Sequence, residues 1–186
     1  MSINPNLPEK PKESRVGRTN QRYNPETGSR MVAGCVCLNS TKDKVVMISS
    51  SVNPGKWVLP KGGIELDEGD DFVITAVRET WEEAGCEGPI VKKLPVVLDS
   101  RGMKAPILKE KDFDPEKVIP KSEFHFYEMQ VTELSSKWPE MDQRQRRWCT
   151  YSEAKHELLK AKRPELVSAL DSSGIIKDYE KDEDLY

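Results

Sequence analysis

The order of predicted elements in this 186-residue chain indicates an α/β protein (α+β), in which a mixed β-sheet lies between helices. Three observations support this fold class. Strand-like runs stand on both sides of one amphipathic helix, a second helix is predicted late, and residues 30–38 (RMVAGCVCL) are almost entirely apolar. A strand that is apolar on both faces needs cover on both sides, so we expect helices on both faces of the sheet.

The first half of the chain supplies three predicted strands. Residues 30–38 and 44–49 (KVVMIS) flank a short polar turn and are expected to pair as a hairpin. Residues 57–59 form a short strand that Pro60 ends. Residues 61–63 (Lys-Gly-Gly) predict a tight turn, in which glycine lets the backbone approach another group closely.

A helix is predicted between this turn and Gly85, which suits a helix C-terminus. Asp70 or Asp71 can cap its first turn. Its apolar face is indicated by residues that recur at helical spacing, namely Val73, Ala76, Val77, Thr80 and Ala84.

The second half of the chain adds strands at 90–98, 123–131 and 147–151. A helix is expected from Ser152, its predicted cap, to Leu159, and Pro164 lies near its end or begins another turn.

One domain, residues 30–172, accounts for these elements. A Pro- and charge-rich loop insertion interrupts it at about 99–121. Residues 1–29 have no periodicity and are expected to form a flexible arm, and residues 173–186 are expected to form a solvated acidic tail.

The composition of the chain limits the partners, metals and cell compartments that are expected. The net charge of -3 gives no global basic field, so we expect no stable nucleic acid partner. The four cysteines form no CxxC pair and there are two histidines, which argues against zinc and for buried, reduced thiols. No apolar run suits a membrane span or a signal peptide, so a cytoplasmic protein is expected, with access to the nucleus left open. The sequence does not show the oligomeric state, and a monomer is the default expectation.

Three carboxylates are the strongest chemical signal in the chain. Glu79, Glu82 and Glu83 stand at i, i+3 and i+4, so a helix places them on one face, where like charges repel. A hard divalent cation with oxygen ligands would offset that repulsion. The alternative is an ordinary solvated acidic face.

The residues around this cluster resemble the Nudix motif, G-x5-E-x7-R-E-U-x-E-E-x-G-U, where U is aliphatic. Its second half is similar to Arg78 through Cys86, and its first half to Gly62-x5-Glu68. Nine residues stand between Glu68 and Arg78 where the motif has seven, which leaves open whether Glu68, Asp70 or Asp71 braces Arg78.

This resemblance implies a Nudix α/β/α sandwich and a Mg2+-dependent hydrolase, in which Mn2+ or another divalent ion can substitute. It implies Glu79 and Glu83 as metal ligands, assisted by Glu82 and by a main-chain carbonyl near Lys61 or Gly62. The general base is expected within the pair Glu82 and Glu83, with Glu82 preferred. Arg78 would orient one of these carboxylates.

The likeness extends to the fungal diphosphoinositol polyphosphate phosphohydrolases, which also cleave diadenosine polyphosphates. It is carried by residues 49–51, 57–60, 147–148 and 152–154 and by Glu-Thr-Trp-Glu-Glu-Ala-Gly-Cys, and covers about residues 17–172. The resemblance implies phosphate-binding positions at Arg22, Arg30, Ser50, Ser51 and Arg144. Val52 departs from it, because family members have arginine there.

Further phosphate ligands are expected because a compact polyanion needs many cations and hydrogen-bond donors. Lys61, Lys121, His125 and Arg163 are candidates, although each could equally be surface charge, or for His125 a core histidine. The aromatic residues at 124–127 could stack a base, but they are more typical of a core.

These observations predict a Mg2+-dependent hydrolase of phosphoanhydride bonds in a highly phosphorylated small molecule. Diphosphoinositol polyphosphates and diadenosine polyphosphates are the expected substrates, with inorganic polyphosphate as a further one. One alternative is hydrolysis of an mRNA cap or ADP-ribose. Another is a non-catalytic sensor of phosphorylated ligands, which the retention of all three glutamates disfavours.

Overall fold

A computed structural model describes residues 7–99 and 120–178. The expected loop insertion therefore lies almost wholly outside the described residues, as do both chain ends.

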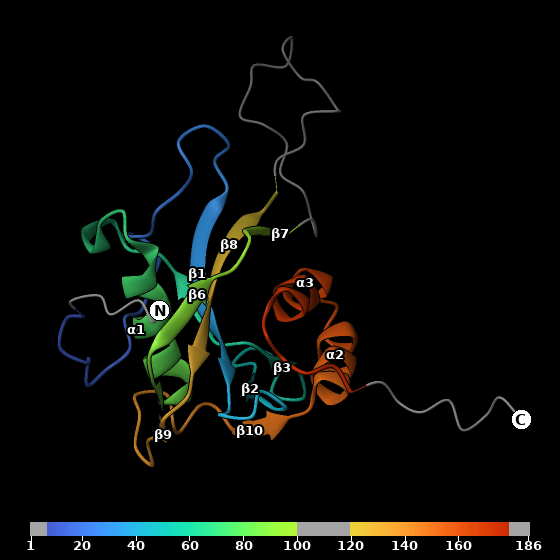
Figure 1. Cartoon of the computed structure of the whole chain (residues 1–186). Coiled ribbons are helices and arrows are strands. Elements are labelled where there is room, and N and C mark those ends of the chain that lie inside the picture. Colours follow the sequence, from blue (N-terminus) through green and yellow to red (C-terminus); the bar gives the residue numbers. More distant parts are fainter. Residues whose placement is uncertain (1–6, 100–119, 179–186) are drawn as a thin grey trace, which may run out of the picture.

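In the described residues one large mixed sheet forms the centre of the molecule (Figure 1). Its main path runs β10 (Arg146–Cys149), β2 (Val45–Ser49), β1 (Arg30–Leu38), β8 (Ser122–Gln130) and β6 (Ile90–Lys93). The short strands β3 (Trp57–Val58), β4 (Lys61–Gly63) and β7 (Val97–Asp99) pair with β2, β1 and β8. Strands β1 and β8 are parallel and their neighbours antiparallel. A separate small sheet pairs β5 (Cys86–Glu87) with β9 (Glu133–Leu134).

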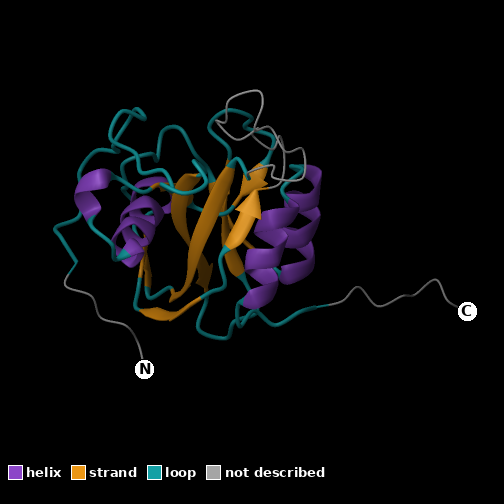
Figure 2. Cartoon of the chain, turned by 90° about the horizontal axis from the view of Figure 1, so that it is seen from above, coloured by secondary structure: helices purple, strands orange, loops and turns teal. Residues whose placement is uncertain are grey.

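Helices cover both faces of this sheet. Helix α1 (Phe72–Ala84), preceded by the short 3-10 helix η1 (Leu66–Glu68), lies on one face, and α2 (Tyr151–Lys160) and α3 (Pro164–Ser172) lie on the other (Figures 1 and 2). Every residue of β1 except Arg30 is buried, as its apolar sequence predicts. The predicted α/β/α class and the hairpin of β1 and β2 are confirmed.

The predicted tight turn at 61–63 is wrong, because these residues form strand β4. They pair antiparallel with β1, with Gly62 opposite Ala33 and Lys61 opposite Gly34. The chains approach so closely that a Cβ atom at Gly34 would lie 2.3 Å from the Pro60 carbonyl oxygen. Gly34 therefore serves close strand packing, whereas Gly62 and Gly63 leave room for the side chains of Glu79 and Gln21.

Three boundaries in the second half also differ from expectation. The strand predicted at 90–98 divides into β6 and β7, because Pro95 lacks the amide that a continuous ladder needs. Thr150, not Ser152, caps α2: its side chain accepts a bond from the Glu153 amide, while Glu153 accepts one from the Thr150 amide at 2.9 Å. Pro164 stands in the first turn of a further helix, α3, where its missing amide costs nothing.

Both ends of the described chain contact the domain. Residues 7–29, expected to be a flexible arm, run along it, and the Arg22 amide donates to the Ile64 carbonyl at 2.7 Å. Beyond α3, Ile175 is buried and the Ile176 amide donates to the Lys42 carbonyl at 2.7 Å. Main-chain hydrogen bonds to distant segments therefore hold parts of the chain that have no periodic pattern of their own.

All four cysteines are buried and free, as the sequence predicts for a reduced protein core. Among the helices of the described ranges, none is long and apolar enough to cross a membrane.

We expect Thr150→Ala to lower the free energy of unfolding by about 0.5–2 kcal/mol, because the first turn of α2 loses its capping oxygen. Chemical denaturation of both proteins measures this. Thr150→Ser keeps the oxygen and serves as the matched control. Equal stability of the Ala variant and the wild type would show that the cap contributes nothing.

Candidate active site

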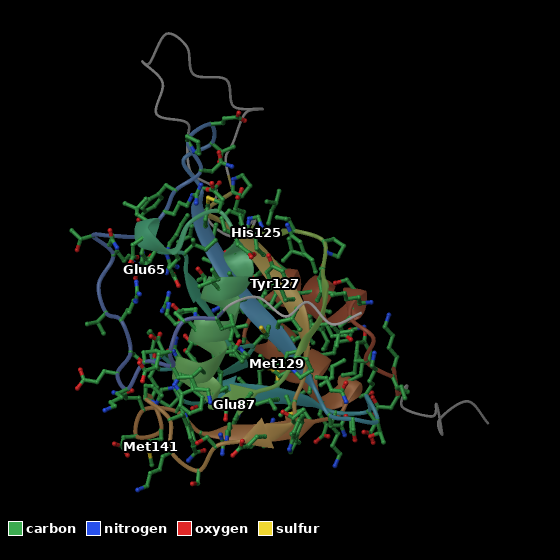
Figure 3. The ribbon with its side chains drawn as sticks, turned by 60° about the vertical axis from the view of Figure 1, so that its left-hand side comes forward. Glu65, Glu87, His125, Tyr127, Met129 and Met141 are labelled. Atoms are coloured by element: carbon green, nitrogen blue, oxygen red, sulfur yellow. The ribbon has the colours of Figure 1, made fainter. Side chains whose placement is uncertain are left out.

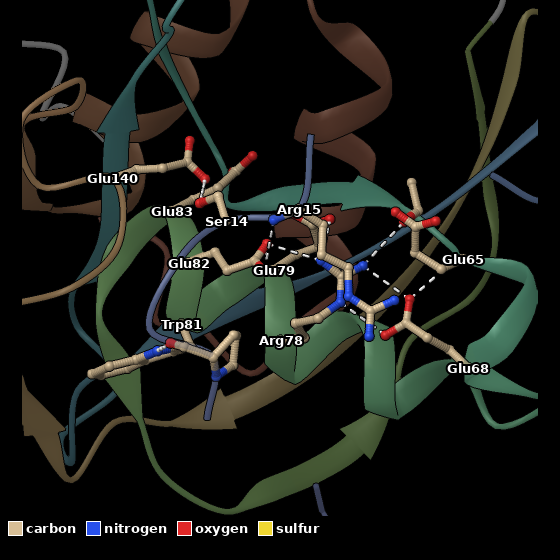
Figure 4. Close-up of polar contacts among 12 residues, drawn as sticks. Ser14, Arg15, Glu65, Glu68, Arg78, Glu79, Trp81, Glu82, Glu83 and Glu140 are labelled. Atoms are coloured by element: carbon tan, nitrogen blue, oxygen red, sulfur yellow. Dashed lines mark hydrogen bonds and ion pairs between the residues drawn. The ribbon is translucent and has the colours of Figure 1, made fainter. Parts of the chain in front are cut away.

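The guanidinium of Arg78 is the hub of the polar cluster on α1 (Figure 4). Its Nε and Nη2 donate to the two oxygens of Glu68 at 2.8 and 2.9 Å. Its Nη1 donates to Glu79 at 3.0 Å and to Glu82 at 2.9 Å, and Nη2 also reaches the Gly63 carbonyl at 3.3 Å. Burial alone would lower the pKa of Arg78, but the bond to Glu68 and the charges of Glu79 and Glu82 raise it overall.

This geometry decides which acidic residue braces Arg78. Glu68 does so with both oxygens, despite the two additional residues before the arginine. Asp71 caps α1 by accepting from the Val73 amide, and Asp70 pairs with Arg22 at 2.6 Å. The additional residues are accommodated between η1 and α1, where Gly69 has a φ of 73°.

The Glu79 carboxylate lies directly against the backbone of β4. A Cβ atom at Gly62 would lie 2.0 Å from its carboxyl carbon, so only glycine leaves room for it. Burial raises the pKa of Glu79 well above its ordinary value, and the nearby charge of Glu83 raises it further. A further positive charge nearby would therefore stabilise the ionised form of Glu79.

Glu83 is held by donors from two elements. The Lys61 amide donates to one oxygen at 3.0 Å, and Arg144 Nη2 donates to the other at 3.1 Å. Arg144 is itself fixed by Glu140 and by the Ser49 carbonyl, at 2.9 and 3.1 Å. Burial raises the pKa of Glu83 to about 7, although the charges of Arg144 and Lys61 oppose this rise.

Glu82 shares Arg78 Nη1 with Glu79 but projects in a different direction from Glu83, its neighbour in sequence. One oxygen accepts from Arg78, and the other accepts from the main-chain amide of Arg15 at 3.2 Å. Its side chain is 1% exposed and does not line the cavity described below. The family resemblance favours Glu82 as the base, whereas in this arrangement Glu83 is the glutamate of that pair that reaches the cavity.

A cavity of about 680 Å3 opens beside Glu79 and Glu83. Gly62 also lines it. The structure brings together here six of the predicted phosphate-binding residues, namely Arg30, Ser51, Lys61, Lys121, Arg144 and Arg163. Cations and the predicted metal-binding carboxylates, which are far apart in sequence, therefore share one space.

The other three predicted ligands, Arg22, Ser50 and His125, do not line the cavity. Arg22 is engaged by Asp70 and lies 5.3 Å from the centre of the Phe72 ring. The Ser50 hydroxyl accepts from the Asn53 amide at 3.3 Å, within its own loop.

His125 lies on the opposite face of β8, because side chains alternate along a strand and its neighbour Phe124 lines the cavity. Its ring packs edge-on against Phe72 at 4.7 Å, and Nε2 lies 3.1 Å from Glu123. Figure 3 shows it on β8 with Tyr127 and Met129. This placement is that of the core histidine considered as the alternative.

Several residues of this cavity are not predicted by any pattern in the sequence. Ser14, Arg15 and Arg18 come from the segment that was expected to be flexible, and Glu140 comes from a loop without periodicity. The sequence shows basic residues in the first segment, but no local pattern assigns them to a site whose carboxylates lie about 60 residues further along the chain.

The carboxylates fit a partly hydrated divalent ion. Among the described residues, no three His, Cys, Asp or Glu side chains form a group able to hold a metal ion. Mg2+ commonly uses only one or two protein carboxylates and completes its shell with water and substrate phosphates. Glu79 and Glu83, both on the cavity wall and both with a pKa that burial raises, supply that number.

The raised pKa of Glu83 predicts how stability depends on pH without divalent ions. The folded protein holds this proton up to about pH 7, whereas the unfolded chain releases it near the ordinary value of 4.5. The protonated Glu83 therefore contributes to the free energy of unfolding at low pH, and this contribution is lost as the pH rises from 4.5 through 7. In EDTA, the melting temperature should fall less steeply between pH 5 and pH 8 for Glu83→Gln than for the wild type. Parallel curves would contradict the assignment.

The chain is similar to known proteins of one family. A model of the NUDIX domain matches residues 28–170. "Nudix hydrolase 16, mitochondrial" of Arabidopsis thaliana is 38% identical over 153 residues, which cover 76% of this chain and 78% of that protein. "Diphosphoinositol polyphosphate phosphohydrolase 3-alpha" of Homo sapiens is 32% identical over 135 residues, which cover 71% and 70%.

The fold has a counterpart among solved structures. A NUDIX hydrolase from Nitrosomonas europaea superposes with a TM-score of 0.52 and 14% identity, covering 77% of this chain and 87% of that one. The matched domain, this shared fold and the arginine-braced carboxylates on α1 agree with one another. The chain therefore belongs to the Nudix hydrolase family.

Proposed function

We propose that this Nudix hydrolase cleaves phosphoanhydride bonds in densely phosphorylated small molecules, chiefly diphosphoinositol polyphosphates and diadenosine polyphosphates, with inorganic polyphosphate as a further substrate. The observation that carries this proposal is a cavity that combines Glu79 and Glu83 with a surrounding set of cations. The name of the human relative supports the substrate class, while that of the plant relative gives no substrate.

The charges of the cavity favour a polyanion. Arg30 donates to the neutral Gln21 at 2.6 Å, and neither Arg30 nor Lys61 forms an ion pair within the described part of the chain. Burial, together with the nearby charge of Arg163, lowers the pKa of Lys61 to about 8. A ligand with several phosphates would relieve this crowding of positive charge, and it would do so more fully than a ligand with two.

The proposed chemistry gives roles to three residues of α1, namely Glu79, Glu83 and Arg78. Mg2+, for which Mn2+ can substitute, would neutralise the phosphoanhydride and acidify a water when bound by Glu79 and Glu83. Glu83 is the proposed acceptor of the proton from the attacking water, because Lys61 and Arg144 fix its carboxylate at the cavity. Arg78 keeps Glu79 in place and does not touch substrate.

We expect Glu83→Gln to lower kcat by about 10²–10⁴, the usual contribution of general-base catalysis. Glu82→Gln should lower kcat much less, because Glu82 does not reach the cavity and its loss acts through Arg78 and the Arg15 amide. Steady-state kinetics at saturating Mg2+ measures both, and circular dichroism checks the fold. A larger loss in Glu82→Gln than in Glu83→Gln would return the base to Glu82.

A competition assay tests the substrate class. We expect kcat/KM for a diphosphoinositol pentakisphosphate or diadenosine hexaphosphate to exceed that for capped RNA or ADP-ribose by about tenfold or more, since more charge-assisted bonds form. Arg30→Ala should remove most of that advantage and weaken its salt dependence, whereas Lys92→Ala, an exposed lysine on β6, should not. Preference for capped RNA or ADP-ribose would overturn the substrate class, and binding without turnover would indicate a sensor.

A further inference from the structure

The N-terminal segment 7–18, here called the strap, lies across the catalytic end of α1. The Trp81 indole donates to the Pro11 carbonyl at 3.0 Å, and the Ser14 hydroxyl donates to Glu140 at 2.7 Å. The Arg15 amide donates to Glu82, and its guanidinium pairs with Asp67 at 2.9 Å. Figure 4 shows Ser14 and Arg15 near Glu140 and Glu82. Fixed contacts on separate elements therefore set the path of the strap.

The chain is anchored again directly after the strap. The Asn20 carbonyl accepts from the Leu66 amide at 2.8 Å, and Gln21 forms a β-bridge with Glu65. Arg18 therefore stands in a short span held at both ends, with Gly17 turning the backbone at a φ of 89°. The Gln21 amide also donates to the Arg18 carbonyl at 3.3 Å, which closes a turn at this point.

Arg18 lines the same cavity as Arg30, Lys61 and the two metal-binding carboxylates. Unlike Arg15, whose charge is offset by Asp67, Arg18 forms no ion pair with the residues that the structure describes. Its charge acts on Arg30: burial lowers the pKa of Arg30, and the charge of Arg18 lowers it further. Two like charges facing one polar space favour an anion between them.

We propose that the strap is one wall of the substrate cavity and that Arg18 binds a substrate phosphate together with Arg30. This inference rests on the proposed function, because it assumes a ligand with several phosphates. Its consequence for Glu82 is a positioning role: this carboxylate holds the strap through the Arg15 amide and joins it to the Arg78 hub. The strap thereby connects the carboxylates of α1 to Arg18 and Arg30, which bind phosphates away from the bond that is cleaved.

Calorimetric binding of inositol hexakisphosphate to the full-length protein, in buffer without divalent ions, tests this inference separately from turnover. We expect Arg18→Ala to weaken binding by about tenfold, as for the loss of one charge-assisted hydrogen bond, and to weaken the salt dependence. Lys12→Ala removes an exposed strap cation that does not line the cavity, and should change affinity by less than about twofold. Arg18→Lys should recover part of the loss.

Gly17→Ala provides a second variant that keeps every charge. A side chain at a φ of 89° is strained, although the space around it is open, so the effect acts through the backbone path. We expect weaker binding than in Lys12→Ala. Equal affinity of Arg18→Ala and Lys12→Ala would overturn the inference, as would failure of the wild type to bind the ligand. Loss of binding in Arg18→Ala supports it even where a parallel assay finds no hydrolysis of diphosphoinositol substrates.

Discussion

The arrangement of the site depends on the burial of one guanidinium. Arg78 cannot lose its charge, so its burial requires acceptors on every side. Glu68, Glu79, Glu82 and the Gly63 carbonyl supply them, and they come from η1, α1 and β4. The same guanidinium thus fixes the helix against the glycine-containing strand. One cation among three carboxylates leaves an excess of negative charge, and Glu79 presents it to the cavity.

Features with a local cause could be predicted from the sequence. The first hairpin, α1 with its glycine end, and the acidic cluster follow from periodicity and glycine chemistry. The different directions of the glutamate side chains follow from helix geometry, but the acidic spacing alone did not reveal them. Successive helical residues are about 100° apart, so Glu82 and Glu83 must point in different directions. Glu79 and Glu83, four positions apart, stay nearly aligned and share the cavity.

Other parts of the site depend on contacts between segments that are distant in sequence. Six of the nine expected phosphate ligands line the cavity, but strand alternation places His125 behind it, and Asp70 engages Arg22 outside it. The strap reaches Trp81 and Glu140 from the other end of the chain. Neither propensity nor spacing within residues 7–18 contains that information, because the partners exist only after the sheet and α1 have formed.

The parallel pairing of β1 with β8 has a consequence for folding. Arg30 pairs with Ser122 and Leu38 with Gln130, so the central ladder joins segments roughly ninety residues apart. Closing so long a stretch of chain carries an entropy cost that only extensive burial repays, which makes this ladder a late and slow event. The β1 and β2 hairpin and α1, by contrast, need only local contacts. A nascent or stretched molecule can therefore have its acidic helix formed while the later cations of the cavity, Lys121, Arg144 and Arg163, are not yet in place.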